Sequence, residues 1–443
     1  FFFFSRLPSR TVLGRDFGFS ARDPTPVCFR VGERGPRHGT PARFGIASGP
    51  AMNLLGNTLA DVICRPQKHS TYDLGSDLFE LKRTRSFGFG TVVVRRFDTE
   101  MKNNAGQKLQ CSHYVPSSQK GDHTLCSRAF PTVIYCHGSG SSRSEGNPIV
   151  DFLLPRGIAV FSFDFSGAGM SEGSSSSMGY REQDDLRSVV NFLAAHPSVD
   201  GLGVWGRSMG AAAALMVAQD CCHLDAVVAD SSFLSLEQAV TEWAGSRIGF
   251  DSVPGLSYFS LHVLRHLVRD REGFDISEVA PSKSILAGGR SPPVLFGAAL
   301  HDEVVGCHHS QELYNLHMQR HGENADCHLA NFSGTHNSAR PSEFMEQASD
   351  FLVQRLRRRR RTRTRTRTSV CIIALCAIIL LLTLLLHSCA VGKPGRSSLP
   401  PSLVALQLAT CRVACSWHPA ACPREERPPD SWRDWWTIAF VNA

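Results

Sequence analysis

Short apolar runs alternate along the chain with segments of helical periodicity. The apolar runs, rich in Val, Ile and Phe and followed by Gly-containing turns, lie at 132–136, 158–165, 203–205, 226–229, 294–299 and 327–332. Helical stretches lie between them at 183–196, 209–219 and 310–320. Almost wholly apolar strands indicate a sheet buried on both faces. Their alternation with helices predicts a mostly parallel, doubly wound α/β sheet, with a ligand crevice at the carboxyl ends of its strands.

The sequence Gly206-Arg207-Ser208-Met209-Gly210 lies between a predicted strand and an Ala-rich predicted helix. A nucleophile elbow needs this context, because the tight turn leaves room only for glycine on either side of the serine. The turn also exposes the serine hydroxyl at the N-terminus of the following helix. The alternative is a serine that caps an ordinary helix. We expect Ser208 to be a nucleophile.

A serine hydroxyl needs a general base, and the base needs an acid that orients it. In elbows of this kind the chain order is serine, acid, histidine. His336 follows the last predicted strand, and Asp302 follows the strand at 294–299. Asp230, at the end of the strand at 226–229, is the rival acid. The order favours a Ser208, Asp302 and His336 triad.

A tetrahedral intermediate needs two N–H groups directed at its oxyanion. We expect these from Met209, which follows the nucleophile, and from Ser139, in the sequence His-Gly-Ser-Gly after the first predicted strand.

Three further histidines, His301, His308 and His309, lie close together in the sequence and could suggest a metal site. No HExxH motif or carboxylate at ligand spacing accompanies them, so we predict neither a metal ion nor a cofactor.

Several motifs keep their order along the chain: YCHGSGSS (135–142), FDFSGAGMSEG (163–173), GYREQDDLRSVVNFL (179–193), WGRSMGA (205–211) and GTHNSARP (334–341). Together they resemble the α/β-hydrolase superfamily, and within it the serine-aminopeptidase-like, esterase/lipase-type family of plants and protists. The resemblance covers about 52–356 and implies an α/β-hydrolase fold with Ser208, Asp302 and His336 as its triad.

The segment at about 233–280 lies between two predicted core strands and is expected to form a helical lid over the site. Its aromatic residues, Trp243, Phe250, Tyr258 and Phe259, suggest an apolar acyl pocket, although a packed lid core would need the same residues.

Charge is distributed unevenly along the chain, whose formal net charge is +7. The stretch 52–354 is acidic, at −9, whereas 1–51 carries +5 and 355–369 carries +9. Residues 1–51 lack periodicity and are interpreted as a disordered extension or as translated upstream sequence before Met52. The Arg/Thr-rich segment at 357–369 is of low complexity and has no capacity to form a core.

An apolar segment follows the arginines. Val370 to Leu386 contains only one polar residue, Thr383, and extension to residue 391 gives a length that can cross a bilayer. We therefore predict a transmembrane helix at 370–391, with a disordered tail at 392–443. The arginines on its N-terminal side predict that the preceding domain faces the cytosol. If the C-terminal segment comes from a gene-model error, the protein is cytoplasmic.

These features predict a serine hydrolase that acts through an acyl-enzyme on ester or thioester bonds. The expected substrates are acyl-bearing small molecules, lipid esters or S-acylated proteins, with membrane lipids contacting the span and the arginines. An amide hydrolase of the serine-aminopeptidase type and a catalytically inactive, membrane-tethered binding domain are the alternatives. No nucleic-acid partner is expected, since no aromatic residues are interleaved with the arginines.

Overall fold

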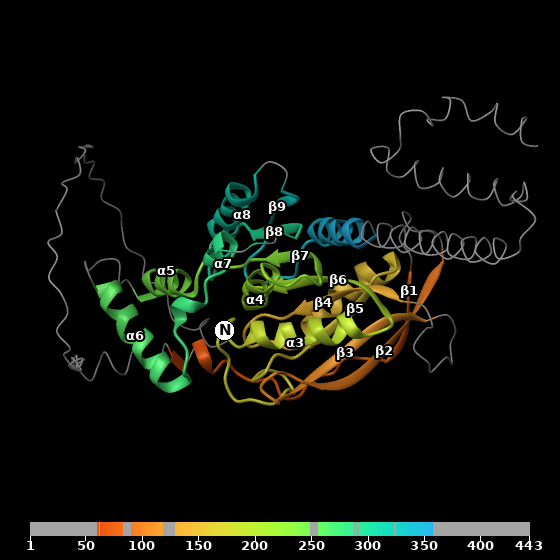
Figure 1. Ribbon diagram of the computed structural model, residues 1–443, viewed down its shortest axis with the longest axis horizontal. Coiled ribbons are helices and arrows are strands. Elements are labelled where there is room, and N and C mark those ends of the chain that lie inside the picture. Colours follow the sequence, from red (N-terminus) through yellow and green to blue (C-terminus); the bar gives the residue numbers. More distant parts are fainter. Residues whose placement is uncertain are drawn as a thin grey trace, which may run out of the picture. The chain divides into compact units, whose positions relative to one another are not determined.

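The computed structural model describes residues 60–357, apart from 62, 83–89, 118–128, 249–255, 288, 290–291 and 323–324 (Figure 1). The predicted N-terminal extension, membrane segment and tail lie outside the described residues, as does the Arg/Thr-rich segment beyond residue 357. No helix in the described part of the chain is both long and apolar enough to cross a bilayer.

The core of the fold is a nine-stranded sheet in the order β1-β2-β3-β5-β4-β6-β7-β8-β9. The six predicted strands are all present, as β4 (Phe130–Cys136), β5 (Ala159–Phe163), β6 (Val199–Arg207), β7 (Leu224–Asp230), β8 (Val294–Ala299) and β9 (Cys327–Phe332). Each of these pairs in parallel with its neighbours in this group. The prediction of a mostly parallel sheet is therefore confirmed.

Three N-terminal strands were not among the predicted ones: β1 (Leu78–Lys82), β2 (Thr91–Lys102) and β3 (Lys108–Ser117). They pair antiparallel to one another, and β3 pairs antiparallel to β5. Much of β2 is exposed, and charged residues interrupt it. A strand with one solvated face has no continuous apolar run, so the sequence of β2 lacks the pattern of a buried strand.

Helices cover both faces of the sheet. The core on one face contains apolar residues of α3 (Glu182–Ala195), α4 (Met209–Ala218) and α8 (Cys307–His321). The core on the other face contains residues of α2 (Asn147–Leu153) and of a final helix over 342–357. In Figure 1, α3 and α4 lie side by side across the sheet. Every residue of α4 is buried, as expected for an Ala-rich helix at the centre of a doubly wound fold.

Between β7 and β8 the chain forms a group of helices, called the helical cover below, in the region where the sequence predicted a lid. It consists of α5 (Leu236–Ile248), α6 (Leu256–Glu272), a short 3-10 helix η6 (Ile276–Glu278) and α7 (Pro281–Ala287). Two ion pairs from Asp275, with Arg265 and Arg269, connect α6 to the start of η6.

Candidate active site

Ser208 occupies a strained turn between β6 and α4. Its backbone φ of 52° and ψ of −116° are unusual for a residue with a side chain, and such strain costs about 1–3 kcal/mol. A Cβ atom at Gly206 would lie 2.3 Å from the Gly210 oxygen, and one at Gly210 would lie 2.1 Å from the Cys136 oxygen. Close contacts with the backbone therefore require glycine at both positions of the motif. The Ser208 N–H donates a hydrogen bond to the main-chain oxygen of Asp230 at 2.8 Å.

Three side chains from separate strand ends form one hydrogen-bonded chain. Ser208 Oγ lies 3.0 Å from His336 Nε2, and His336 Nδ1 lies 2.7 Å from Asp302 Oδ2. Ser208 follows β6, Asp302 follows β8 and His336 follows β9, so the carboxyl edge of the sheet brings them together. All three side chains are buried: Ser208 is 7% and His336 is 5% exposed, and the Asp302 side chain is 1% exposed.

The second oxygen of Asp302 is fixed by the main chain. Asp302 Oδ1 accepts the N–H groups of Val304 and Val305 at 2.9 and 2.8 Å. These bonds leave Oδ2 directed at the imidazole. The sequence had suggested the acid but not the two amides that orient it.

Asp230, the rival acid, has a different partner. Its carboxylate accepts two hydrogen bonds from the Arg340 guanidinium, at 2.8 and 3.0 Å, and one from Ser231 Oγ at 3.0 Å. The carboxylate that contacts His336 is therefore that of Asp302.

The loop after β4, residues 137–142, lies close to the nucleophile and is called the oxyanion loop below. A Cβ atom at Gly138 would lie 3.8 Å from Ser208 Cβ. The Ser139 N–H takes part in no hydrogen bond between described residues, and Met209 is the first residue of α4, ahead of the first intrahelical bond. Both amides that the sequence indicated are thus available as donors.

The buried His137 ring links the oxyanion loop to the segment that follows β5. Its Nε2 accepts the Phe165 N–H at 3.1 Å, so the neutral ring carries its proton on Nδ1 and donates it to the Gly138 oxygen at 2.8 Å. Burial lowers the pKa of His137, which favours this neutral form.

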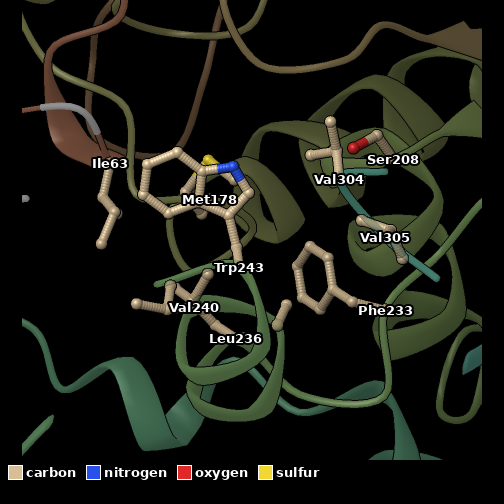
Figure 2. Close-up of a pocket in the computed structure, with 10 residues that line it drawn as sticks. Ile63, Met178, Ser208, Phe233, Leu236, Val240, Trp243, Val304 and Val305 are labelled. Carbon is tan, nitrogen blue, oxygen red and sulfur yellow. The ribbon is translucent and has the colours of Figure 1, made fainter. Parts of the chain in front are cut away.

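An apolar pocket opens beside Ser208 (Figure 2). The space between its lining residues, including the part open to solvent, is about 600 Å³. Apart from Ser208 its lining is apolar: Ile63, Met178, Phe233, Leu236, Ala239, Val240, Trp243, Val304 and Val305. Four of these, from Leu236 to Trp243, come from α5, so the helical cover contributes directly to the pocket. The side chains of Phe250, Tyr258 and Phe259, which were also expected to line an acyl pocket, lie outside the described part of the structure.

Two of the clustered histidines lie near a carboxylate of α5. Glu242 Oε2 is 3.2 Å from His308 Nε2 and 3.0 Å from His309 Nε2, a grouping that resembles a metal site. However, His309 Nδ1 accepts the N–H of Leu234 at 3.3 Å. The proton of the neutral ring is therefore on Nε2, and the lone pair that a metal ion would need faces Leu234 instead. We interpret the group as a polar contact between α5 and α8.

Known proteins resemble part of this chain. A family model described as serine aminopeptidase, S33, matches residues 127–272. The uncharacterized protein YfhR of Escherichia coli is 28% identical over 263 residues, which are 57% of this chain and 78% of that protein. The lysophosphatidylserine lipase ABHD12 of Xenopus tropicalis is 26% identical over 198 residues, 43% of this chain and 48% of that protein.

Among solved structures, the esterase Pf2001 of Pyrococcus furiosus aligns with 66% of this chain and 99% of its own. The sequence identity is 21% and the TM-score is 0.46.

Proposed function

We propose that the chain is a serine hydrolase of the α/β-hydrolase superfamily that cleaves ester or thioester bonds through an acyl-enzyme intermediate. The observation that carries this proposal is the hydrogen-bonded chain from Ser208 Oγ through the His336 ring to Asp302. None of the three side chains is replaced, which argues against a catalytically inactive binding domain.

Each residue has a defined task in the proposed reaction. Ser208 Oγ attacks the acyl carbonyl while His336 Nε2 accepts its proton, and Asp302 holds the Nδ1 proton and stabilises the imidazolium. The developing oxyanion is bound by the N–H groups of Met209 and Ser139. His336 then returns the proton to the leaving alcohol or thiol, and water attacks the acyl-enzyme by the same route.

The pocket favours an acyl group over the amino end of a peptide. An aminopeptidase must hold a charged amine, and desolvating that charge requires a carboxylate or comparable acceptor. Apart from Ser208, the pocket is lined by aliphatic, thioether and aromatic side chains. Such a surface suits a hydrocarbon chain. Similarity to a lysophosphatidylserine lipase agrees with acyl esters of lipids as the substrate class.

Membrane anchoring through 370–391, a cytosolic orientation and lipid or S-acylated protein partners remain predictions from the sequence.

The test is activity of the full chain against matched acyl substrates. Esters, a thioester and an amino-acid amide that share an acyl group would be compared, with Ser208→Ala as the control. We expect ester and thioester turnover that falls by about 10⁶ in the variant, as for a comparable triad. Exclusive cleavage of the amide would reject the ester assignment, and turnover that survives Ser208→Ala would reject the nucleophile.

A further inference from the structure

Arg207 and Glu145 form an ion pair that reaches three parts of the active site. Arg207 Nη1 pairs with Glu145 Oε1, and Arg207 Nη2 donates to the main-chain oxygen of His336 at 2.7 Å. Glu145 Oε2 accepts the N–H of Gly138 at 2.8 Å. Only 18% of the arginine side chain and 13% of the glutamate side chain are exposed, so the pair is shielded from solvent screening.

These contacts join two loops that are distant in the sheet. The oxyanion loop follows β4, whereas His336 lies in the loop 333–341 after β9, called the base loop below. Strands β6, β7 and β8 separate β4 from β9 in the sheet. Because Arg207 directly precedes Ser208, one guanidinium is linked to the nucleophile, the base loop and, through Glu145, the oxyanion loop.

A second guanidinium supports the base loop from another side. Arg340 Nη1 donates to the oxygens of Thr335, His336 and Ser338, at 3.2, 3.2 and 3.1 Å, while its remaining nitrogens bind Asp230. Among the described residues, Arg340 forms no hydrogen bond or ion pair with the oxyanion loop, unlike the pair of Arg207 and Glu145. Both arginines therefore hold the base loop, and between the described residues it is the Arg207–Glu145 pair that connects this loop to the oxyanion loop.

We infer that Arg207 and Glu145 are positioning residues, which hold the His336 ring and the Ser139 N–H in register with Ser208 Oγ. The inference rests on the proposed serine-hydrolase function. Correct placement of separate reacting groups accounts for a large part of enzymatic rate enhancement, and a displacement of about 1 Å can cost about 100-fold.

Arginine is the residue type that this arrangement requires. Its planar guanidinium can donate to Glu145, to the His336 oxygen and to Asn337 Oδ1, the last at 3.0 Å, at the same time. A lysine keeps the charge but has a single nitrogen with no fork. In Glu145→Gln the amide oxygen can still accept the Gly138 N–H, but the ion pair with Arg207 is lost.

The test compares Arg207→Lys, Glu145→Gln and the double variant in the full chain. For an ester substrate we expect each single variant to lower kcat by about 10- to 100-fold with KM changed less than about threefold. The double variant should fall little further, because both changes break the same pair. Arg187→Lys is the matched control, because Arg187 forms an ion pair with Asp220 on the surface, at 2.6 Å. The kcat of this variant should stay within about twofold of the wild-type value.

A spectroscopic signal distinguishes a change in the position of the His336 ring from a change in turnover or in stability. The proton between His336 Nδ1 and Asp302 should give a low-field ¹H resonance, which should shift or broaden in the Arg207 and Glu145 variants but not in Arg187→Lys. An unchanged resonance with unchanged kcat would overturn the inference, as would a lowered melting temperature with kcat retained. If the wild-type chain hydrolyses no ester, the proposed function fails, and the resonance still decides whether the pair positions the ring.

Discussion

Replacement of Asp302 by Asn should reverse the hydrogen-bond direction in the triad. The Val304 and Val305 N–H groups already point at one oxygen of this side chain, at 2.9 and 2.8 Å. In Asp302→Asn only the amide oxygen can accept from them, so the NH₂ group must face His336 Nδ1. The ring must then carry its proton on Nε2, where it can no longer accept the proton of Ser208.

The expected loss follows from these contacts. A hydrogen bond to a charged group contributes about 1.5–3 kcal/mol, equivalent to about 10- to 150-fold in rate. Removing general-base function in addition costs about 10²- to 10⁴-fold. The loss of the charged hydrogen bond and the loss of the general base are not independent, so we expect kcat to fall by about 10³- to 10⁴-fold.

The assay is ester turnover at neutral pH, with thermal unfolding measured in parallel. Asp302→Asn keeps the size of the side chain and both main-chain hydrogen bonds, so the melting temperature should change by less than about 3 °C. The Glu303→Gln variant, at the neighbouring carboxylate, should keep its kcat within about threefold. A loss below about tenfold in Asp302→Asn would refute the assignment of the orienting acid.

Three further changes have clear expected outcomes. Gly210→Ala places a Cβ atom 2.1 Å from the Cys136 oxygen, so thermal unfolding should show a melting temperature lower by at least about 5 °C; an unchanged value would contradict the tight elbow. Trp243→Ala removes an aromatic wall of the pocket, so KM for a long-chain ester should rise about tenfold while that for an acetate ester stays constant; equal effects on both esters would argue against an acyl pocket. Burial lowers the pKa of His113 to about 4, whereas an unfolded histidine titrates near 6.5. The folded state therefore disfavours the proton, and this ring should cost about 2 kcal/mol of stability between pH 7 and pH 5, as measured by denaturant unfolding. His113→Phe should remove that part of the pH dependence, because the ring packs edge-on against Phe161 and phenylalanine cannot be protonated.

The sequence could indicate which three side chains lie together because its signals are local. The elbow at 206–210 is a steric requirement within five residues, and Asp302 and His336 each follow a recognisable buried strand. In a parallel sheet all such strand ends lie along one edge. The order of the motifs was therefore enough to place the three side chains near one another.

The supporting contacts could not be predicted in the same way. Glu145 reaches Arg207 across 62 residues, and Arg340 reaches Asp230 across 110. Each residue type is compatible with a solvated surface, so only the tertiary fold shows that the pairs are buried. The same holds for β1 and β2, which contain exposed charged residues, and for β3, whose buried stretch includes the polar residues Ser112 and His113. It also holds for Asp230, which the sequence left as a possible acid.

Mass spectrometry of the acyl-enzyme tests the central claim most directly. The full chain would be mixed with a slowly hydrolysed ester, quenched with acid within the first turnovers and digested. We expect a mass increase equal to the acyl group on the peptide that contains Ser208, and no such adduct in Ser208→Ala. An acyl group on another residue, or ester turnover with no acylated Ser208, would contradict the proposed mechanism.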